Sequence, residues 1–426
     1  MIKIYNRSEL SLENILDRTS ADPSQIIKIE KAVDQILAEV KSRGDSALFE
    51  YTESFDKVIL DNLKVTEQEL DNAYQATDSE FIEILEEAVE NISFFHKKQL
   101  RTGFEITEKD GIVLGQKITP LKRVGIYVPG GTASYPSTVL MNAIPARIAG
   151  VEEIVMVSPP DKNGSIPQMI LAAAKIAGVN KIFKVGGAQA VASLAYGTES
   201  IPKVDKIVGP GNIYVTTAKQ KVFGLVDIDM IAGPSEILVI ADSTADIKCV
   251  AADLLSQAEH DKLASAVLIC TCIEYAKNVS EEIERQLSDL PRNNIARESI
   301  DNNGKIIVVN NIDEAIEISN EIAPEHLEIC VDNPFDYLDK IKNAGSIFLG
   351  KHTPEALGDY FAGPNHTLPT SGTARFSSPL SVDEFIKKSS YISYSKEALD
   401  KVKDKIITFA EKEGLDGHAR SIEVRF

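Results

Sequence analysis

The sequence has few cysteines and lacks a long apolar run. Only four of its 426 residues are cysteines, too few for a disulfide scaffold, which suits a reducing cytoplasm. No stretch of about 18 apolar residues occurs, so we expect no membrane-spanning helix. The N-terminal segment lacks a basic start followed by an apolar stretch, and we expect no secretory signal. These absences predict a cytoplasmic protein.

The sequence also lacks an excess of positive charge. Its 64 acidic and 45 basic residues give a formal net charge of −19. Phosphate backbones and anionic lipids repel such a chain, so we predict neither nucleic acid nor membrane as a partner. Many soluble enzymes are acidic simply for solubility, so this charge has an ordinary explanation as well. With 43% apolar and 26% charged residues the composition is that of a globular protein.

From about residue 118 onward, short apolar runs alternate with helical patterns. The runs are rich in Val and Ile, as in RVGIYV, EEIVMV, SEILVI and SAVLIC. Apolar strands separated by helices indicate mostly parallel sheets covered on both faces. We therefore predict an α/β protein of two units with mostly parallel sheets flanked by helices, an incomplete Rossmann-like arrangement. We place the units at residues 120–233 and 234–380.

Helical patterns flank these two units. After an N-terminal segment at 1–25, apolar residues recur at helical spacing, and we expect residues 26–119 to pack on the second α/β unit. Residues 381–426 are expected to form a helical tail, with one helix ending at Gly414 as a C-cap.

Four glycine-rich turns lie beside predicted strands. A strand, a glycine turn and a helix N-terminus together can hold a phosphate. The chain has neither G-x-G-x-x-G nor a phosphate-binding G-x-x-x-x-G-K-[ST] motif, so the turns indicate a cleft at the C-terminal edge of a sheet without naming its ligand. The turns are Pro129-Gly130-Gly131-Thr132, Gly186-Gly187-Ala188-Gln189, Gly209-Pro210-Gly211-Asn212 and Gly233-Pro234-Ser235-Glu236.

Candidate metal ligands lie in two segments. In SQAEHD, Gln257 and His260 are three residues apart on a predicted helix, which places an amide oxygen and an imidazole nitrogen on one face. The segment GDYFAGPNHTLPT reads as a loop with Asp359 and His366, and its carboxylate could be a hard ligand. Each of these residues alone also fits a helix cap or a surface charge.

Glu325 and His326 form a candidate catalytic pair in APEHLE, where a helix ends and a strand begins. Neighbours on a regular strand point to opposite faces, so joint action requires the bend that Pro324 supplies. A carboxylate and an imidazole placed together could share acid–base work on one substrate. A polar turn at a strand entry is the alternative.

Eight segments, in order, resemble the histidinol dehydrogenase family. They are RVGIYVPGG, VGGAQA, VGPGN, IAGPSE, SQAEHD, APEHLE, AGSIFLG and GDYFAGPNHTLPT. The resemblance is densest between Arg123 and Tyr394, and a shared superfold alone would not give this set. It implies a zinc-dependent enzyme that oxidises L-histidinol through bound L-histidinal to L-histidine with two NAD⁺, the last step of histidine biosynthesis.

The resemblance also implies roles for individual residues. Glu325 and His326 match the catalytic pair. The implied ligands of one zinc ion per subunit are Gln257, His260, Asp359 and His418. The implied NAD contacts are Tyr127, Gln189 and Asn212. The implied substrate contacts are Ser235, Glu413, His326 and the four zinc ligands. The family further implies a homodimer whose tail carries Glu413 and His418 into the partner's active site.

Donor chemistry agrees with this zinc site, because oxygen and nitrogen donors without a thiolate suit an open catalytic centre. Three alternatives stay open. A protein of the same fold could use zinc and NAD on another polyol or amino alcohol. A zinc hydrolase could activate water with Glu325, but this would leave the glycine turns and the second unit unexplained. The complete set of site residues argues against a catalytically silent binding protein.

Overall fold

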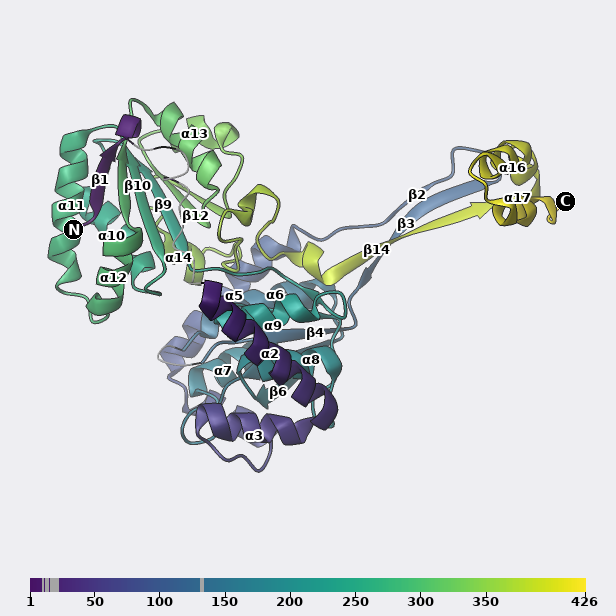
Figure 1. The fold of residues 1–426 in the computed structure, drawn as a ribbon, viewed down its shortest axis with the longest axis horizontal. Coiled ribbons are helices and arrows are strands. Elements are labelled where there is room, and N and C mark those ends of the chain that lie inside the picture. Colours follow the sequence, from purple (N-terminus) through teal and green to yellow (C-terminus); the bar gives the residue numbers. More distant parts are fainter. Residues whose placement is uncertain (10, 12–14, 16–22, 131–133) are drawn as a thin grey trace.

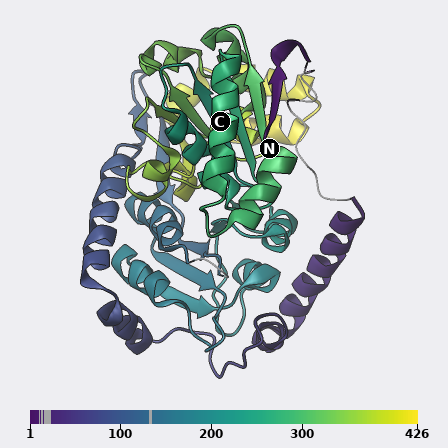
Figure 2. The same cartoon turned by 90° about the vertical axis from the view of Figure 1, so that its left-hand side faces the viewer.

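The computed structural model describes residues 1–9, 11, 15, 23–130 and 134–426. The described chain forms two α/β units, which lie one above the other in Figure 2, and an arm that extends away from them in Figure 1. Both units contain an all-parallel sheet, which confirms the predicted α/β class. In the described part of the chain, no helix combines the length and apolarity needed to cross a membrane.

The first unit is built on a five-stranded sheet in the order β6-β5-β4-β7-β8. Its strands are largely buried, which explains their nearly continuous apolar sequences. The strands are β4 (Arg123–Tyr127), β5 (Glu153–Ser158), β6 (Lys181–Lys184), β7 (Lys206–Val208) and β8 (Asp227–Ile228). The helices between them are α6 (Pro136–Ala149), α7 (Gln168–Ala177), α8 (Gly187–Tyr196) and α9 (Ile213–Val222).

The second unit is built on a six-stranded sheet in the order β1-β11-β10-β9-β12-β13. The N-terminal segment contributes its edge strand, β1, which pairs with β11. The strands are β1 (Lys3–Asn6), β9 (Glu236–Ala241), β10 (Ser265–Cys270), β11 (Lys305–Val308), β12 (His326–Cys330) and β13 (Ser346–Leu349). The helices are α10 (Ile247–Ala258), α11 (Ile273–Leu287), α12 (Asn293–Asn303), α13 (Ile312–Ile322) and α14 (Glu355–Tyr360).

The helices of residues 26–119 cover the first unit, so the expectation that they pack on the second is wrong. Helix α2 packs on α8 and α9, α4 on α7, and α5 on α6. Their apolar stripes, including Val33 and Ile92, join the same cores as the strands of the first sheet. These helices are α2 (Pro23–Arg43), α3 (Asp45–Asp56), α4 (Glu67–Ala76) and α5 (Ser79–Lys97).

The arm is a three-stranded antiparallel sheet that carries helices at its tip (Figure 1). Its strands are β2 (Phe104–Ile106), β3 (Ile112–Pro120) and β14 (Ile386–Tyr394). The tip helices are α15 (Lys396–Asp400), α16 (Lys403–Lys412) and α17 (Asp416–Glu423). Gly414 follows α16 with a φ of 73°, as expected at a helix end. The expected helical tail thus begins with a long strand, β14, and 104–120 also contains strands.

Short 3₁₀ turns complete the described fold. They are η1 (Arg7–Glu9), η2 (Pro334–Lys340), η3 (Thr373–Arg375) and η4 (Val382–Phe385).

Candidate active site

Most of the predicted site residues lie at two sheet edges. Tyr127 ends β4, while Gln189 and Asn212 follow β6 and β7, so these three lie at the carboxyl edge of the first sheet. His326 begins β12 and Glu236 begins β9, so the second cluster lies at the amino edge of the second sheet. The predicted residues therefore lie at a carboxyl edge in the first unit only.

The four glycine turns differ in the element that follows each of them. The turns at Gly186 and Gly209 connect strands to α8 and α9, as predicted. The turn at Gly233 leads into β9 instead of a helix. In the first turn, Gly131 and Thr132 lie outside the described residues. Only two turns therefore show the arrangement suited to phosphate.

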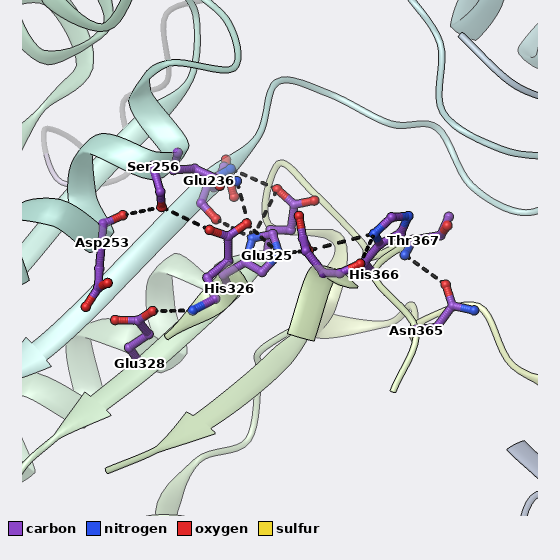
Figure 3. Close-up of polar contacts among 12 residues, drawn as sticks. Glu236, Asp253, Ser256, Glu325, His326, Glu328, Asn365, His366 and Thr367 are labelled. Carbon is purple, nitrogen blue, oxygen red and sulfur yellow. Dashed lines mark hydrogen bonds and ion pairs between the residues drawn. The ribbon is translucent and has the colours of Figure 1, made fainter. Parts of the chain in front are cut away.

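The imidazole of His326 is the centre of the second cluster (Figure 3). The side chain is buried, and its Nδ1 lies 3.1 Å from the Glu236 carbonyl oxygen. A carbonyl oxygen only accepts hydrogen bonds, so this contact assigns the proton to Nδ1 and leaves Nε2 as the acceptor. Nε2 has no hydrogen-bond partner among the described residues, and it lies 3.9 Å from Asp359 and 4.0 Å from Glu355. Burial lowers the pKa of His326 to about 3, which favours the neutral base.

Glu325 lies beside this imidazole. Its carboxylate is 3.7 Å from His326 Nδ1 and accepts a hydrogen bond of 2.8 Å from the Glu236 backbone N–H. The chain turns before β12 at Ala323, whose φ is 51°, one residue ahead of Pro324, where the bend was expected. The two adjacent side chains lie together, as expected for a pair that acts jointly. Burial raises the pKa of Glu325 well above its usual range.

Three side chains could hold a metal ion together. The ligand atoms of His326, Glu355 and Asp359 all lie within 4.8 Å of one another. Glu355 and Asp359 are four residues apart on α14 and so share one helix face. Burial raises their pKa values, to about 7 for Glu355 and about 6 for Asp359. A bound cation would favour the ionised forms of both carboxylates.

Glu355 was not among the predicted site residues. Its signal in the sequence is the four-residue spacing from Asp359 in EALGD. His366 was noticed in its loop without a role. It is partly buried beside α14, with Nδ1 3.1 Å from the Asp359 carbonyl oxygen. Neighbouring Asn365 donates a 2.6 Å hydrogen bond to the Met141 carbonyl oxygen, which ties the loop to the first unit.

Gln257 and His260 approach the cluster differently. Gln257 is buried in the last turn of α10, and its amide nitrogen lies 3.4 Å from His326 Nδ1. Its Oε1 has no hydrogen-bond partner in the described ranges, so it could serve a ligand. His260 lies beyond the helix end and is exposed, so the predicted shared helix face is wrong. Its charged form would still lower the pKa of nearby His326.

Polar side chains of α10 and β12 support α14, and Figure 3 labels three of them, Asp253, Ser256 and Glu328. Glu328 accepts a 2.8 Å hydrogen bond from the Glu355 backbone N–H, and Ser256 donates to the Glu355 carboxylate at 3.0 Å. Burial raises the pKa of Glu328 well above its usual range, and the nearby Asp253 carboxyl group raises it further. These supporting residues could not be predicted from the sequence, because each of them alone resembles an ordinary strand or helix position.

The three predicted nucleotide contacts have different hydrogen-bond partners. The Tyr127 hydroxyl accepts a 3.0 Å hydrogen bond from Gly187 N–H. Asn212 caps α9, accepting from the N–H groups of Tyr214 and Val215. Gln189 is buried, and its Oε1 lacks a partner within the described chain. These positions can face a ligand that lies along the carboxyl edge.

The remaining predicted residues divide between the site and the arm. Ser235 precedes Glu236, whose backbone contacts both Glu325 and His326, so it lies beside the cluster. Glu413 caps the end of α16 and His418 lies in α17, and both are exposed. Figure 1 shows these two helices at the tip of the arm, far from β12 and α14. One chain alone does not bring these two residues to the site.

Comparisons with known proteins agree on one family. The model of the family described as histidinol dehydrogenase matches residues 19–426. The chain is 57% identical over 418 residues to histidinol dehydrogenase of Clostridium acetobutylicum, covering 98% of this chain and 96% of that protein. It is 56% identical over 418 residues to that of Listeria monocytogenes serovar 1/2a, covering 98% of each.

A solved structure shows the same architecture. The crystal structure of histidinol dehydrogenase from Elizabethkingia anophelis matches with a TM-score of 0.93 and 40% identity, covering 100% of this chain and 98% of that one. An acetylating aldehyde dehydrogenase from Geobacillus thermoglucosidasius matches with a TM-score of 0.50 and 14% identity, covering 88% of this chain and 98% of that one. The second likeness concerns the fold alone.

Proposed function

The chain belongs to the histidinol dehydrogenase family, and we propose that it oxidises L-histidinol through bound L-histidinal to L-histidine with two NAD⁺ at a zinc site. Membership makes it an NAD-dependent oxidoreductase of histidine biosynthesis. The observation that carries the finer proposal is the buried His326, whose Nε2 faces Asp359 and Glu355. A neutral imidazole at that place can take a proton from a substrate alcohol.

The donor set fits one zinc ion per subunit. Gln257, His260 and Asp359 of one chain would hold it, together with His418 of a second copy. The orphaned Gln257 Oε1 and the carboxylates near His326 are oxygen donors that need a cation or a proton. Bound zinc would orient the imidazole and amine of the substrate, with Lewis-acid help secondary. Ser235 and, from the second copy, Glu413 complete the proposed substrate contacts.

His326 acts in both oxidations. In the first, Nε2 removes the proton of the alcohol as its carbon loses hydride, which leaves the aldehyde. The hydrogen bond from Nδ1–H to Glu236 fixes the ring and its tautomer, and it stabilises the imidazolium that forms. Bound NAD⁺ supplies the hydride acceptor, one molecule for each oxidation, and Tyr127, Gln189 and Asn212 would contact it.

Glu325 acts between the two oxidations. One carboxylate oxygen is held by Glu236 N–H, which leaves the other to remove a proton from water as the water adds to the aldehyde, while the imidazolium of His326 gives its proton to the carbonyl oxygen. His326 then takes a proton from the resulting gem-diol as hydride leaves, giving the carboxylate. The nucleotide contacts and this pair belong to different units, so exchange of NADH for NAD⁺ need not release the aldehyde.

The alternative is a dehydrogenase of the same fold that acts on another polyol or amino alcohol. The test is initial rates of NADH formation from L-histidinol and from an amino alcohol without an imidazole, both with zinc-loaded protein. We expect a strong preference for L-histidinol, because its ring would occupy a zinc position. Equal kcat/KM values would favour the alternative. Cytoplasmic location and the absence of nucleic acid and membrane partners remain predictions from composition.

We further propose a homodimer with shared sites. Glu413 and His418 are exposed at the tip of the arm. The arm also exposes large apolar side chains, with Ile392 73% and Phe409 68% accessible. Exposed apolar groups on an extended element favour contact with another chain. A second copy would cover them and would receive the two polar residues.

Mixing an Asp359→Ala chain with a His418→Ala chain is expected to restore activity. Each heterodimer would contain one site with neither substitution and one with both. Random exchange makes about half of the dimers heterodimers, so recovery should approach about one quarter of the wild-type rate. The measurement is NADH formation before and after subunit exchange, with each single variant as control. Verified heterodimers without recovery would contradict shared sites.

A further inference from the structure

A buried ion pair joins Lys219 of α9 to Asp229 after β8. Their side chains are 3% and 1% exposed, and the proposed chemistry uses neither of them. Burying two charges costs desolvation free energy that well-packed apolar residues would not incur. Stabilisation of the fold is therefore a weak explanation for this pair. Its hydrogen bonds suggest instead that it fixes the local geometry of the chain.

The pair binds both backbone groups of Gly209. Lys219 Nζ donates to the Gly209 carbonyl oxygen at 3.0 Å, and Asp229 Oδ2 accepts from Gly209 N–H at 2.7 Å. Gly209 opens the turn that ends in Asn212, the cap of α9. Its φ is 110°, and a Cβ there would collide with the Tyr127 carbonyl oxygen. The pair thus holds the turn close to the end of β4.

Asp229 also lies at the start of the crossover between the units. Its Oδ1 accepts from Met230 N–H at 2.6 Å. Further along the crossover, Thr216 of α9 donates to the Ala232 carbonyl oxygen at 3.4 Å, and Gly233 N–H donates to Thr370 at 2.6 Å. The same segment then enters β9. The buried pair is therefore hydrogen-bonded both to the turn of the first unit and to Met230, at the start of the crossover.

We propose that Lys219 and Asp229 are positioning residues that set the turn Gly209–Asn212 for binding a dinucleotide. This inference rests on the proposed function, because that function places NAD⁺ at the carboxyl edge of the first sheet. The backbone of a glycine turn can approach a diphosphate only if its direction is fixed, and the N-terminus of α9 adds a favourable dipole. The pair fixes that direction without touching the ligand.

Lys219→Met tests the proposal, because methionine keeps an unbranched chain and removes the charge and its donors. We expect the dissociation constant for NAD⁺ to rise about 10- to 100-fold, the scale of a misplaced binding group. Zinc content and the KM for L-histidinol should stay near the wild-type values. Direct NAD⁺ binding is measured by calorimetry on the zinc-loaded, full-length protein.

Lys206→Met is the matched control. Lys206 is also a buried, paired lysine, with its Nζ 2.9 Å from Asp227. It stands at the start of β7, whereas Gly209 follows the end of that strand. Its loss should lower stability while NAD⁺ binding is kept. An equal loss of NAD⁺ affinity in both variants, or unchanged affinity in Lys219→Met, would overturn the proposal.

Asp229→Asn gives a second arm if Lys219→Met does not fold. It keeps an oxygen acceptor for Gly209 N–H and removes the charge that holds Lys219. We expect a smaller rise in the dissociation constant for NAD⁺, again with zinc content and the KM for L-histidinol near the wild-type values. Unchanged NAD⁺ affinity would overturn the proposal. A wild-type protein that binds no NAD⁺ would instead contradict the proposed function.

Discussion

Replacing His326 by asparagine is expected to lower kcat by about 10²- to 10⁴-fold, the usual range for loss of a positioned general base. The asparagine amide can still donate to the Glu236 carbonyl oxygen in place of Nδ1–H, so the strand entry should keep its structure. The substitution removes Nε2, the atom that faces Asp359 and Glu355. Both oxidations need this base, so both should slow.

Pre-steady-state NADH formation at saturating NAD⁺ measures this effect. His352→Asn is the control, because His352 is exposed and has no proposed role. The NAD⁺ dissociation constant should be unchanged in both variants. A rate for His326→Asn within about tenfold of the wild type would show that another group removes the proton.

Removing the metal is expected to abolish activity, and Asp359→Asn should weaken zinc binding by at least about 100-fold. Asp359 lies on α14 beside Glu355 and His326, and its side chain is only 16% exposed. The asparagine is nearly isosteric but lacks the charge, so the fold should survive while the ion is lost. Excess zinc should restore the chelated wild type fully and the variant only partly.

Zinc per subunit after dialysis against a chelator of known affinity measures this prediction. Asp313→Asn is the control, because that carboxylate pairs with Lys340 at 2.5 Å on the surface of the same unit. Its zinc content should match the wild type. A dialysed Asp359→Asn protein with one zinc per subunit would exclude Asp359 as a ligand.

The sequence predicted the two parallel sheets because their strands are buried on both faces. Runs such as EIVMVS in β5 and SAVLIC in β10 could pack only inside a covered sheet. The arm was missed for the opposite reason. β14, IKKSSYISY, is exposed over almost its whole length, and its partner β3 is about 270 residues away. Local patterns carry little information about such a pairing.

The site was predictable where the chemistry is local. Glu325 and His326 are adjacent, and a turn at Ala323 brings them together. Glu355 and Glu328 were missed, because only the packing of α14 against β12 makes two ordinary carboxyl groups part of the site. The packing of residues 26–119 was assigned to the wrong unit, since an apolar stripe shows that a helix is buried but not against which sheet.

The yield of NADH per L-histidinol at limiting substrate, measured with and without a chelator, tests the proposed reaction and its metal together. We expect two NADH for each L-histidinol, with activity lost on chelation and regained with Zn²⁺. One NADH for each L-histidinol would mean that the aldehyde escapes, which would contradict the proposed role of Glu325. No NADH from folded, zinc-loaded protein would contradict the assignment of L-histidinol as substrate.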